Sequence, residues 1–171
     1  MEVFENILTR VSTKKYKNTP VAKEIIDMII EAGKYAPTGR NLQAPIILAV
    51  TNKEIRDKLS KANADVMGVD GDPFYGAPAV LVVLAKKEVR TRVYDGSLVM
   101  GNMLLAAHAV GLGACWIHRA KETFEMPEWQ EWLKTLGIEE EYEGIGNCII
   151  GYPEVMPSVK PRKENWVYYI D

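Results

Sequence analysis

Two groups of basic residues have the types and spacing that bind phosphate. Arg10, Ser12 and Lys14 lie two residues apart, and on an extended segment this spacing places all three side chains on one side. An arginine fork, a hydroxyl and an ammonium that converge in this way suit a phosphate group. The second group is KPRK at residues 160–163, in which proline keeps the backbone extended. Either group alone is more typical of ordinary surface charge.

The segment APTGRNLQAP, residues 36–45, carries much hydrogen-bonding capacity for a short connection. Asn41 and Gln43 are again two residues apart, and each amide offers donors and an acceptor. Such a pair suits a ligand with a polyol or an imide edge. A loop that only ends a helix would account for Pro37 and Gly39, but it would not require the two amides and the neighbouring arginine together.

The segment GLGACWIH, residues 111–118, could approach a flat ligand closely. Gly111 and Gly113 end a helix and allow close approach of the backbone, and Trp116 is a large planar side chain near a strand end. A planar ligand could use backbone N–H groups here. A helix C-cap followed by a core strand is the simpler explanation of these residues taken alone.

Other kinds of chemistry are not indicated. His108 and His118 lack the neighbouring cysteines or acids of a metal site, and we expect His108 to be a core residue. Cys115 and His118 are three apart on a predicted strand and point to opposite faces, which argues against nucleophilic catalysis. Neither GxGxxG nor GxxxxGK[ST] occurs. We expect Trp129 and Trp132 to serve packing.

The elements that must position these residues alternate irregularly between helix and strand. Hydrophobic periodicity predicts helices at 3–10, 20–36, 53–63, 94–113 and 125–137, and strands at 45–51, 77–85, 114–117 and 144–153. Thr19 and Pro20 are the expected N-cap and first residue of the second helix. An αβα sandwich or an α+β layer fold fits this order. The helix at 94–113 is apolar on nearly every face, so we expect a dimer interface to cover it.

Composition limits the classes of protein. The 171 residues are 47% apolar with a net charge of -2, which favours one domain with a sizeable core and argues against a nucleic-acid or anionic-membrane surface. No apolar stretch reaches the roughly 18 residues of a membrane span, and the N-terminus does not resemble a signal peptide. Two distant cysteines indicate free thiols in a reducing compartment, so we expect a cytoplasmic protein.

Four segments occur in the same order as in the FMN-dependent nitroreductase family: RVSTKKY, APTGRNLQAP, DGSLVMGNMLLAAHAVGLGACWI and KPRK. From Arg10 to Lys163 the chain resembles the short, single-domain members of that family. The resemblance implies an α+β fold, a three-layer αβα sandwich with a mixed, mainly antiparallel central sheet, in an intertwined homodimer. It implies one FMN-binding domain over residues 1–171, with an extended tail from about 157 to 171 that reaches the partner subunit.

The resemblance also implies which residues bind FMN, with each of two sites built from both chains. The R-x-S-x-[RK] motif, which contacts the phosphate, the ribityl chain and the pyrimidine edge, corresponds to Arg10, Ser12 and Lys14. The P-[ST]-x-x-N-x-Q motif, supplied by the partner chain, corresponds to Thr38, Asn41 and Gln43. The segment that lies along the flavin near its reactive nitrogen corresponds to Trp116, Ile117, His118 and Arg119. The K-x-R motif of the tail, which clamps the phosphate, corresponds to Lys160 and Arg162.

The implied activity is ping-pong hydride transfer from NADH or NADPH through FMN to a nitroaromatic, a quinone or a similar small acceptor. No catalytic side chain is expected, because the flavin performs the chemistry. The chain departs from the family pattern at Val11, at Lys14 in place of arginine, and in lacking a tryptophan after Pro45. Residues 65–77 are the only candidate for a substrate lid. The alternatives are a flavin-binding carrier or sensor without turnover, a reductive dehalogenase or flavin-fragmenting enzyme on the same scaffold, and a dimer without a cofactor.

Overall fold

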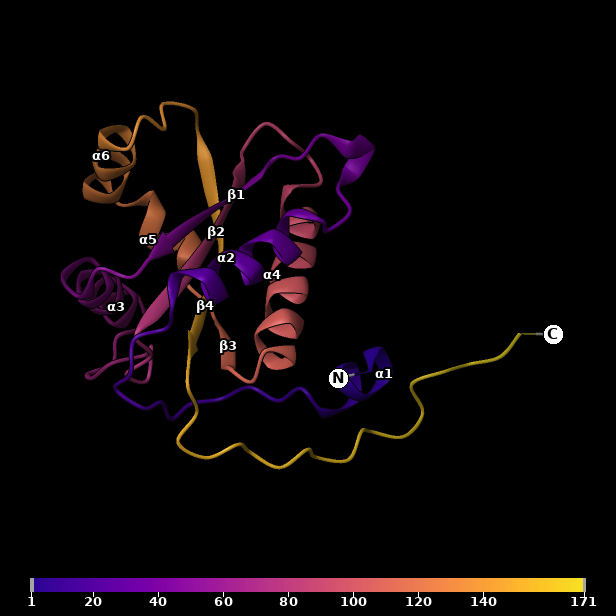
Figure 1. Ribbon diagram of the computed structural model, residues 1–171. Helices are drawn as coiled ribbons and strands as arrows, with labels where there is room; N and C mark the ends of the chain where they lie inside the picture. The colour runs from indigo at the N-terminus through magenta and orange to yellow at the C-terminus, as the bar shows by residue number, and fades with distance from the viewer. Residues whose placement is uncertain (1, 171) are drawn as a thin grey trace.

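The computed structural model describes residues 2–170 (Figure 1). Within this range the elements are α1 (Val3–Thr9), α2 (Lys23–Lys34), the 3₁₀ turn η1 (Gly39–Asn41), β1 (Pro45–Val50), α3 (Lys53–Met67), β2 (Ala79–Lys86), α4 (Arg92–Ala109), β3 (Gly113–Ile117), α5 (Ala120–Glu125), α6 (Pro127–Thr135) and β4 (Tyr142–Gly151).

The four strands of the described chain form one sheet in the order β1-β2-β4-β3, and each neighbouring pair is antiparallel. β2 and β4 are the central strands, and every residue of β4 is buried. Strands covered on both faces read as continuous apolar runs, which explains the pattern of residues 77–85. One parallel bridge, between Ser12 and Ala114, adds a short extended segment beside β3.

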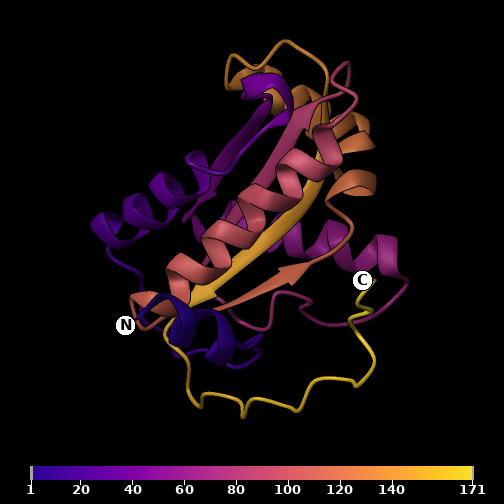
Figure 2. The ribbon, with the colours of Figure 1, turned by 90° about the vertical axis from the view of Figure 1, so that its right-hand side faces the viewer.

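Helices cover both faces of the sheet and make three layers (Figures 1 and 2). Val80, Val82 and Leu84 of β2 pack into a core with residues of α3, α5 and α6. The alternate residues Leu81 and Val83 pack into a second core with residues of α2 and α4. The period of two along β2 therefore divides its side chains between two layers of helices. The predicted α+β sandwich is confirmed.

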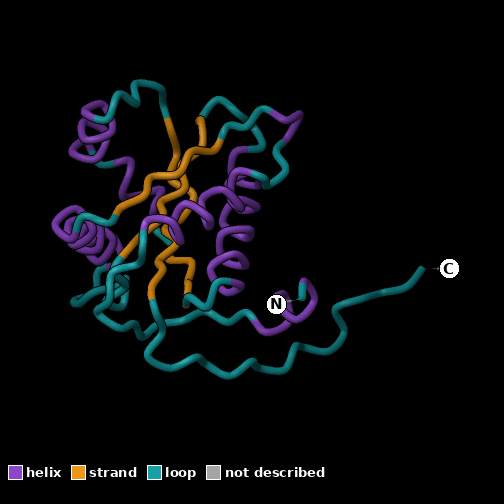
Figure 3. The backbone as a smooth tube through the Cα atoms, viewed as in Figure 1, coloured by secondary structure: helices purple, strands orange, loops and turns teal. Residues whose placement is uncertain are grey.

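Two segments without regular structure pass below the sheet, one between α1 and α2 and one after β4 (Figure 3). The first is tied to the sheet, because the N–H of Thr13 donates to the carbonyl of Ala114 at 3.0 Å and the N–H of Lys17 to that of Tyr152 at 2.8 Å. The second leaves the body of the chain, and residues 154–170 are all exposed.

Several helix boundaries differ from the prediction, among them the end of α4, which is at Ala109 and not at 113, and three of the differences have a clear local reason. α2 begins at Lys23 and not at Pro20, because the backbone stays extended through its N-cap Ala22 while Val21 is buried in the core. α3 continues to Met67, where Gly68 ends it in the left-handed conformation. The helix predicted at 125–137 is α6, which begins only at Pro127 because Met126 precedes a proline and is extended, and the short helix α5 before it was not predicted.

One stripe of α4 is exposed in the single chain, and the predicted dimer interface that would cover it stays a prediction. Met100, Met103 and Ala107 face the core, but Tyr94 is 73% exposed and Leu98 is 48% exposed. Among residues 2–170, no helix is both long and apolar enough to span a membrane.

Candidate functional site

The segment Arg10–Lys14 lies against the first residues of β3 with its polar side chains turned outward. Ser12 and Lys14 are exposed and Arg10 is partly exposed, while Thr13 between them is fully buried. A Cβ atom on Gly113 would lie 2.7 Å from the Thr13 side chain, so only glycine permits this close contact. The alternation that the spacing of two predicts is present, and it leaves cationic donors on the solvent side.

A loop after α3 contacts this row of donors. The Lys14 ammonium lies 5.3 Å from the centre of the Tyr75 ring, which is within the range of a cation–π interaction. Tyr75 itself adopts a left-handed backbone with φ of 53°. The loop is therefore part of the same surface as the predicted phosphate site.

Asp72 fixes the position of this loop. Its carboxylate accepts hydrogen bonds from Arg56 Nη2 at 2.6 Å, from the N–H groups of Gly76 at 2.7 Å and Phe74 at 2.9 Å, and from the Ser60 hydroxyl. Burial alone would raise the pKa of Asp72, but these donors outweigh it and hold the pKa below its usual value. The predicted lid at 65–77 is thus partly helix, up to Met67, and otherwise a loop anchored by a carboxylate.

The far end of β3 holds Trp116, whose indole N–H is buried and has no hydrogen-bond partner within residues 2–170. A Cβ atom on Gly146 would lie 2.5 Å from this nitrogen, so the opposite strand leaves room for the indole only because it carries glycine there. The His118 ring is 6.1 Å from the Trp116 ring. Ile117 is buried with 9% exposure, so its side chain belongs to the core.

The turn after β3 exposes two cationic or polar side chains. Arg119 has φ of 77°, and both His118 and Arg119 are exposed. Asn63 of α3 donates to the His118 carbonyl at 2.6 Å, and Arg119 pairs with Glu122 at 2.8 Å. The turn is therefore held from two sides.

The loop Thr38–Gln43 is strained. Arg40, Asn41 and Gln43 all adopt φ between 50° and 55°. A left-handed backbone costs an L-residue about 1–2 kcal/mol, with asparagine among the more tolerant types. The side chains bond within the loop: the N–H of Gln43 donates to Thr38 Oγ1 at 3.1 Å and its amide donates to Asn41 Oδ1 at 3.2 Å. Strain of this kind concentrates at functional sites.

A cleft of about 750 Å³ lies beside this loop. Thr38, Asn41 and Gln43 line one part of it, and Ile30 of α2 and Ile46 of β1 line another. Polar amides beside an apolar wall are the usual make-up of a ligand site.

These groups do not meet within one chain. The N-terminal segment lies near the C-terminal end of α4, where Thr9 Oγ1 is 2.9 Å from His108 Nε2. The loop 38–43 lies at the other end, where Gly39 contacts Asp95. At 1.5 Å per residue, the 13 residues between Asp95 and His108 span about 20 Å. Lys160 and Arg162 are exposed on the extended tail. The structure thus brings together the first group and β3 and leaves the loop apart from them, while Lys160 and Arg162 of the tail are exposed to solvent.

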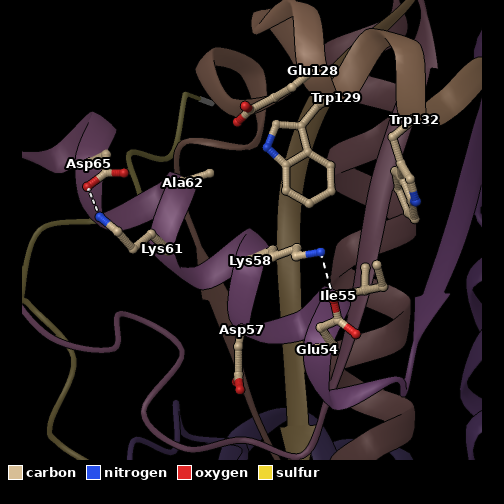
Figure 4. A pocket seen from close by; sticks show the side chains of 10 residues that line it. All are labelled: Glu54, Ile55, Asp57, Lys58, Lys61, Ala62, Asp65, Glu128, Trp129 and Trp132. Carbon is tan, nitrogen blue, oxygen red and sulfur yellow. Dashed lines mark hydrogen bonds and ion pairs between the residues drawn. The ribbon is translucent and has the colours of Figure 1, made fainter.

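A second groove, of about 650 Å³, lies between α3 and α6 (Figure 4). Its two lysines are already paired one turn away, Lys58 with Glu54 and Lys61 with Asp65, both at 2.7 Å. Trp129 is 6% exposed, as expected of a packing residue. Because its lysines are already paired and its indole is buried, nothing in this groove indicates a catalytic or binding function.

Metal and thiol chemistry find no support. Within residues 2–170, no cluster of three or more histidine, cysteine, aspartate or glutamate side chains could hold a metal ion. Cys115 and Cys148 are free and buried, and burial, with Cys115 nearby, raises the pKa of Cys148 to about 12. His108 is a core residue as predicted: burial lowers its pKa, and the positive charge of Arg10 lowers it further.

Sequence reasoning missed Tyr75, Asp72 and Asp95. The sequence did offer a signal for Asp95, because it is the one acidic residue within the mostly apolar segment 95–110. The sequence carried no such signal for Tyr75 and Asp72, because the side chains that they contact lie in other segments of the chain.

The model of the Nitroreductase family matches residues 7–152. A putative NADH dehydrogenase/NAD(P)H nitroreductase of Methanothermobacter thermautotrophicus is 32% identical over 120 residues, which are 68% of this chain and 60% of that relative. An FMN reductase [NAD(P)H] of Bacillus subtilis is 26% identical over 178 residues, covering 94% of this chain and 70% of the relative. The crystal structure of a nitroreductase with bound FMN from Bacteroides fragilis superimposes with a TM-score of 0.88 at 25% identity, covering all of both chains.

Proposed function

This chain belongs to the nitroreductase family, and we propose that it is an FMN-dependent NAD(P)H oxidoreductase that reduces a nitroaromatic, a quinone or a similar small acceptor. The observation that carries the proposal is the row of outward-facing donors, Arg10, Ser12 and Lys14, held against β3. The names of its relatives, an NAD(P)H nitroreductase and an FMN reductase, support the same activity.

The residues present fit FMN. A guanidinium, a hydroxyl and an ammonium on one side of a segment suit the phosphate and the polar edge of the flavin. The buried indole N–H of Trp116 lacks a partner among the described residues, and Gly113 and Gly146 permit close packing around β3. The exposed amides of Asn41 and Gln43 suit the ribityl chain or the ring edge. Lys160 and Arg162 are free to reach a phosphate from the tail.

The site needs two chains, so we infer a homodimer with the loop 38–43 and the tail contributed across the interface. One chain separates the loop from the N-terminal donors by about 20 Å along α4. Tyr94, Leu98, Gly101 and Leu105 recur at helical spacing on the outer stripe of α4, where the first two are strongly exposed. An exposed apolar stripe of this kind marks an interaction surface. Residues 157–170 form the described part of the tail that reaches the partner, and residue 171 lies outside the described residues.

FMN held by these residues would supply the hydride and electron transfer between NAD(P)H and the acceptor. The chain's own residues bind and orient. The Lys14 ammonium stabilises negative charge at the pyrimidine edge of the ring. Asn41 and Gln43 fix the orientation of the ring by hydrogen bonds, and Trp116 and the backbone of Ile117 exclude water from one side. His118 and Arg119 belong to the segment that would lie along the flavin near its reactive nitrogen, and no side chain is needed as general acid or base.

We further propose that residues 1–171 form one domain and that the protein works in the cytoplasm. Two buried free cysteines are typical of a reducing compartment.

The test is the visible absorption spectrum of the purified protein supplied with FMN, recorded again after anaerobic addition of NADH or NADPH. Bound flavin bands that bleach with one donor support the proposal and identify the donor. Bound flavin that neither donor bleaches indicates a carrier or sensor. Protein that takes up no FMN contradicts the flavin assignment altogether.

A further inference from the structure

Asp95, in the first turn of α4, holds the loop 38–43 from inside the protein. Its side chain is buried, with 3% exposure. One carboxylate oxygen accepts the N–H of Gly39 at 2.9 Å, and the other accepts the hydroxyl of Thr91 at 2.8 Å. The Thr91 bond holds the carboxylate in the direction that meets Gly39.

This contact is the loop's anchor. The remaining hydrogen bonds of the loop are internal and join Thr38 to Asn41 and Gln43, Gly39 to Leu42, and the two amides to each other. Within residues 2–170, the bond from Gly39 to Asp95 is the one hydrogen bond that joins residues 38–43 to another part of the chain. Without it, the loop would be fastened only at its ends.

The loop also approaches α4 too closely at position 39 for any residue with a Cβ atom. A Cβ atom on Gly39 would lie 2.5 Å from the Thr91 hydroxyl oxygen and 3.0 Å from its methyl carbon. The close approach of the loop to α4 therefore depends on glycine on one side and on the Asp95–Thr91 pair on the other.

The loop that is anchored here is the strained one. Directly after Gly39, three of four residues, Arg40, Asn41 and Gln43, are left-handed. A strained backbone persists only where its surroundings hold it. The exposed amides of Asn41 and Gln43 point where they do because of this backbone conformation, whereas Asp95 itself is out of reach of any ligand.

We propose that Asp95 is a positioning residue of the FMN site: through Gly39 it holds the loop 38–43 in the conformation that presents Asn41 and Gln43 to the cofactor. The inference rests on the proposed function. It assigns to a buried carboxylate, which touches neither cofactor nor substrate, the preorganisation of two groups that do.

The test is a double-mutant cycle on FMN affinity, measured by quenching of flavin fluorescence with wild type, Asp95→Asn, Gln43→Ala and the double variant. Asparagine keeps the shape of the side chain but removes its charge and one acceptor. We expect Asp95→Asn to weaken FMN binding about tenfold, equivalent to ~1.4 kcal/mol. We expect Gln43→Ala to weaken FMN binding in the wild-type background. In the Asp95→Asn background, the fold loss caused by Gln43→Ala should be at most about a third as large.

A matched control separates positioning from general loss of stability. Asn52 caps α3 through its bond to the N–H of Ile55 at 3.0 Å, and Asn52→Ala is expected to lower the melting temperature while leaving FMN affinity within twofold. If Asp95→Asn does not fold, Gly39→Ala replaces it in the cycle, because its Cβ pushes the same loop from α4.

The outcomes distinguish failure of the proposed FMN-dependent function from failure of the proposed role of Asp95. Wild-type protein that does not bind FMN contradicts the proposed function. Wild-type protein that binds FMN, combined with strictly additive effects of the two substitutions, contradicts the role of Asp95 alone. Coupled effects together with an unaffected Asn52→Ala control support it.

Discussion

The ammonium of Lys14 lies 5.3 Å from the centre of the Tyr75 ring, so a loop after α3 holds a side chain of the N-terminal segment. Tyr75 is 40% exposed and has a left-handed backbone. Asp72 fixes its loop by accepting four hydrogen bonds, from Arg56, Ser60, Phe74 and Gly76. The position of a proposed FMN-binding cation thus depends on a loop that itself contributes no charge to the ligand.

Replacing the Tyr75 ring tests this relationship. We expect Tyr75→Ala to weaken FMN binding about two- to fivefold, because an exposed cation–π contact contributes about 0.5–1 kcal/mol. Tyr75→Phe is the matched control, since it keeps the ring and removes only the hydroxyl. Fluorescence titration of FMN measures both. Equal losses in the two variants would assign the effect to the hydroxyl and not to the ring.

Asp72→Asn should destabilise the fold in a pH-dependent way. The lowered pKa of Asp72 means that this carboxylate binds a proton less tightly in the folded state than in the unfolded chain. The ionised carboxylate therefore stabilises the fold fully above about pH 4. We expect a loss of about 1–2 kcal/mol at pH 7, allowing for the partial exposure of the side chain. The difference from wild type should shrink as the pH falls below about 4, in urea unfolding followed by circular dichroism. Asp70→Asn, an exposed change in the same loop, should have little effect, and a constant difference across pH would rule out the linkage.

The tail predicts a charge-specific effect. Arg162→Glu should lower the FMN content of the purified protein at least about tenfold, because it replaces a proposed phosphate ligand by a like charge. Lys163→Glu makes the same change in charge one residue away and should retain most of the flavin. The flavin-to-protein absorbance ratio measures both variants. Unchanged flavin with Arg162→Glu would remove the tail from the site.

Gly101 tests the proposed interface on α4. No other part of residues 2–170 lies within 4 Å of a Cβ atom placed there, so Gly101→Ala in a single chain should stabilise the helix by about 1 kcal/mol. Gly101→Leu is tolerated in one chain for the same reason, but against a second copy its larger side chain should weaken association at least about tenfold. Sedimentation equilibrium of both variants measures this. A dimer unaffected by leucine would place the interface elsewhere.

Local sequence rules predicted most of the architecture. The apolar runs at 45–51 and 77–85 correspond closely to β1 and β2, and the spacing of two predicted the shared side of Ser12 and Lys14. The start of α6 was missed, because the predicted helix 125–137 includes Met126, although Pro127 disfavours helix at the residue before it. The features that were predicted depend on neighbours in sequence, which is why periodicity was sufficient for them.

The rest depends on contacts between distant segments. The left-handed run at Arg40, Asn41 and Gln43 is not a preference of those residue types alone, and it persists beside an anchor on another helix. The exposed stripe on α4 likewise reads in sequence as core, because an apolar side chain has the same pattern against a core as against a partner. The roles of the individual FMN-site residues stay predictions.

α1 and the tail bear on how the protein behaves on dilution. None of the residues Val3–Thr9 is buried, and residues 154–170 are all exposed, so little free energy orders these segments in one chain. Within one chain α1 is held by the bonds of Asn6 to Leu105 and of Thr9 to His108. In the proposed dimer α1 and the tail gain further contacts when two chains meet, and mass action then governs those contacts. The melting temperature should therefore rise with protein concentration, and a dilute solution should release FMN while the sheet and its helices are still folded.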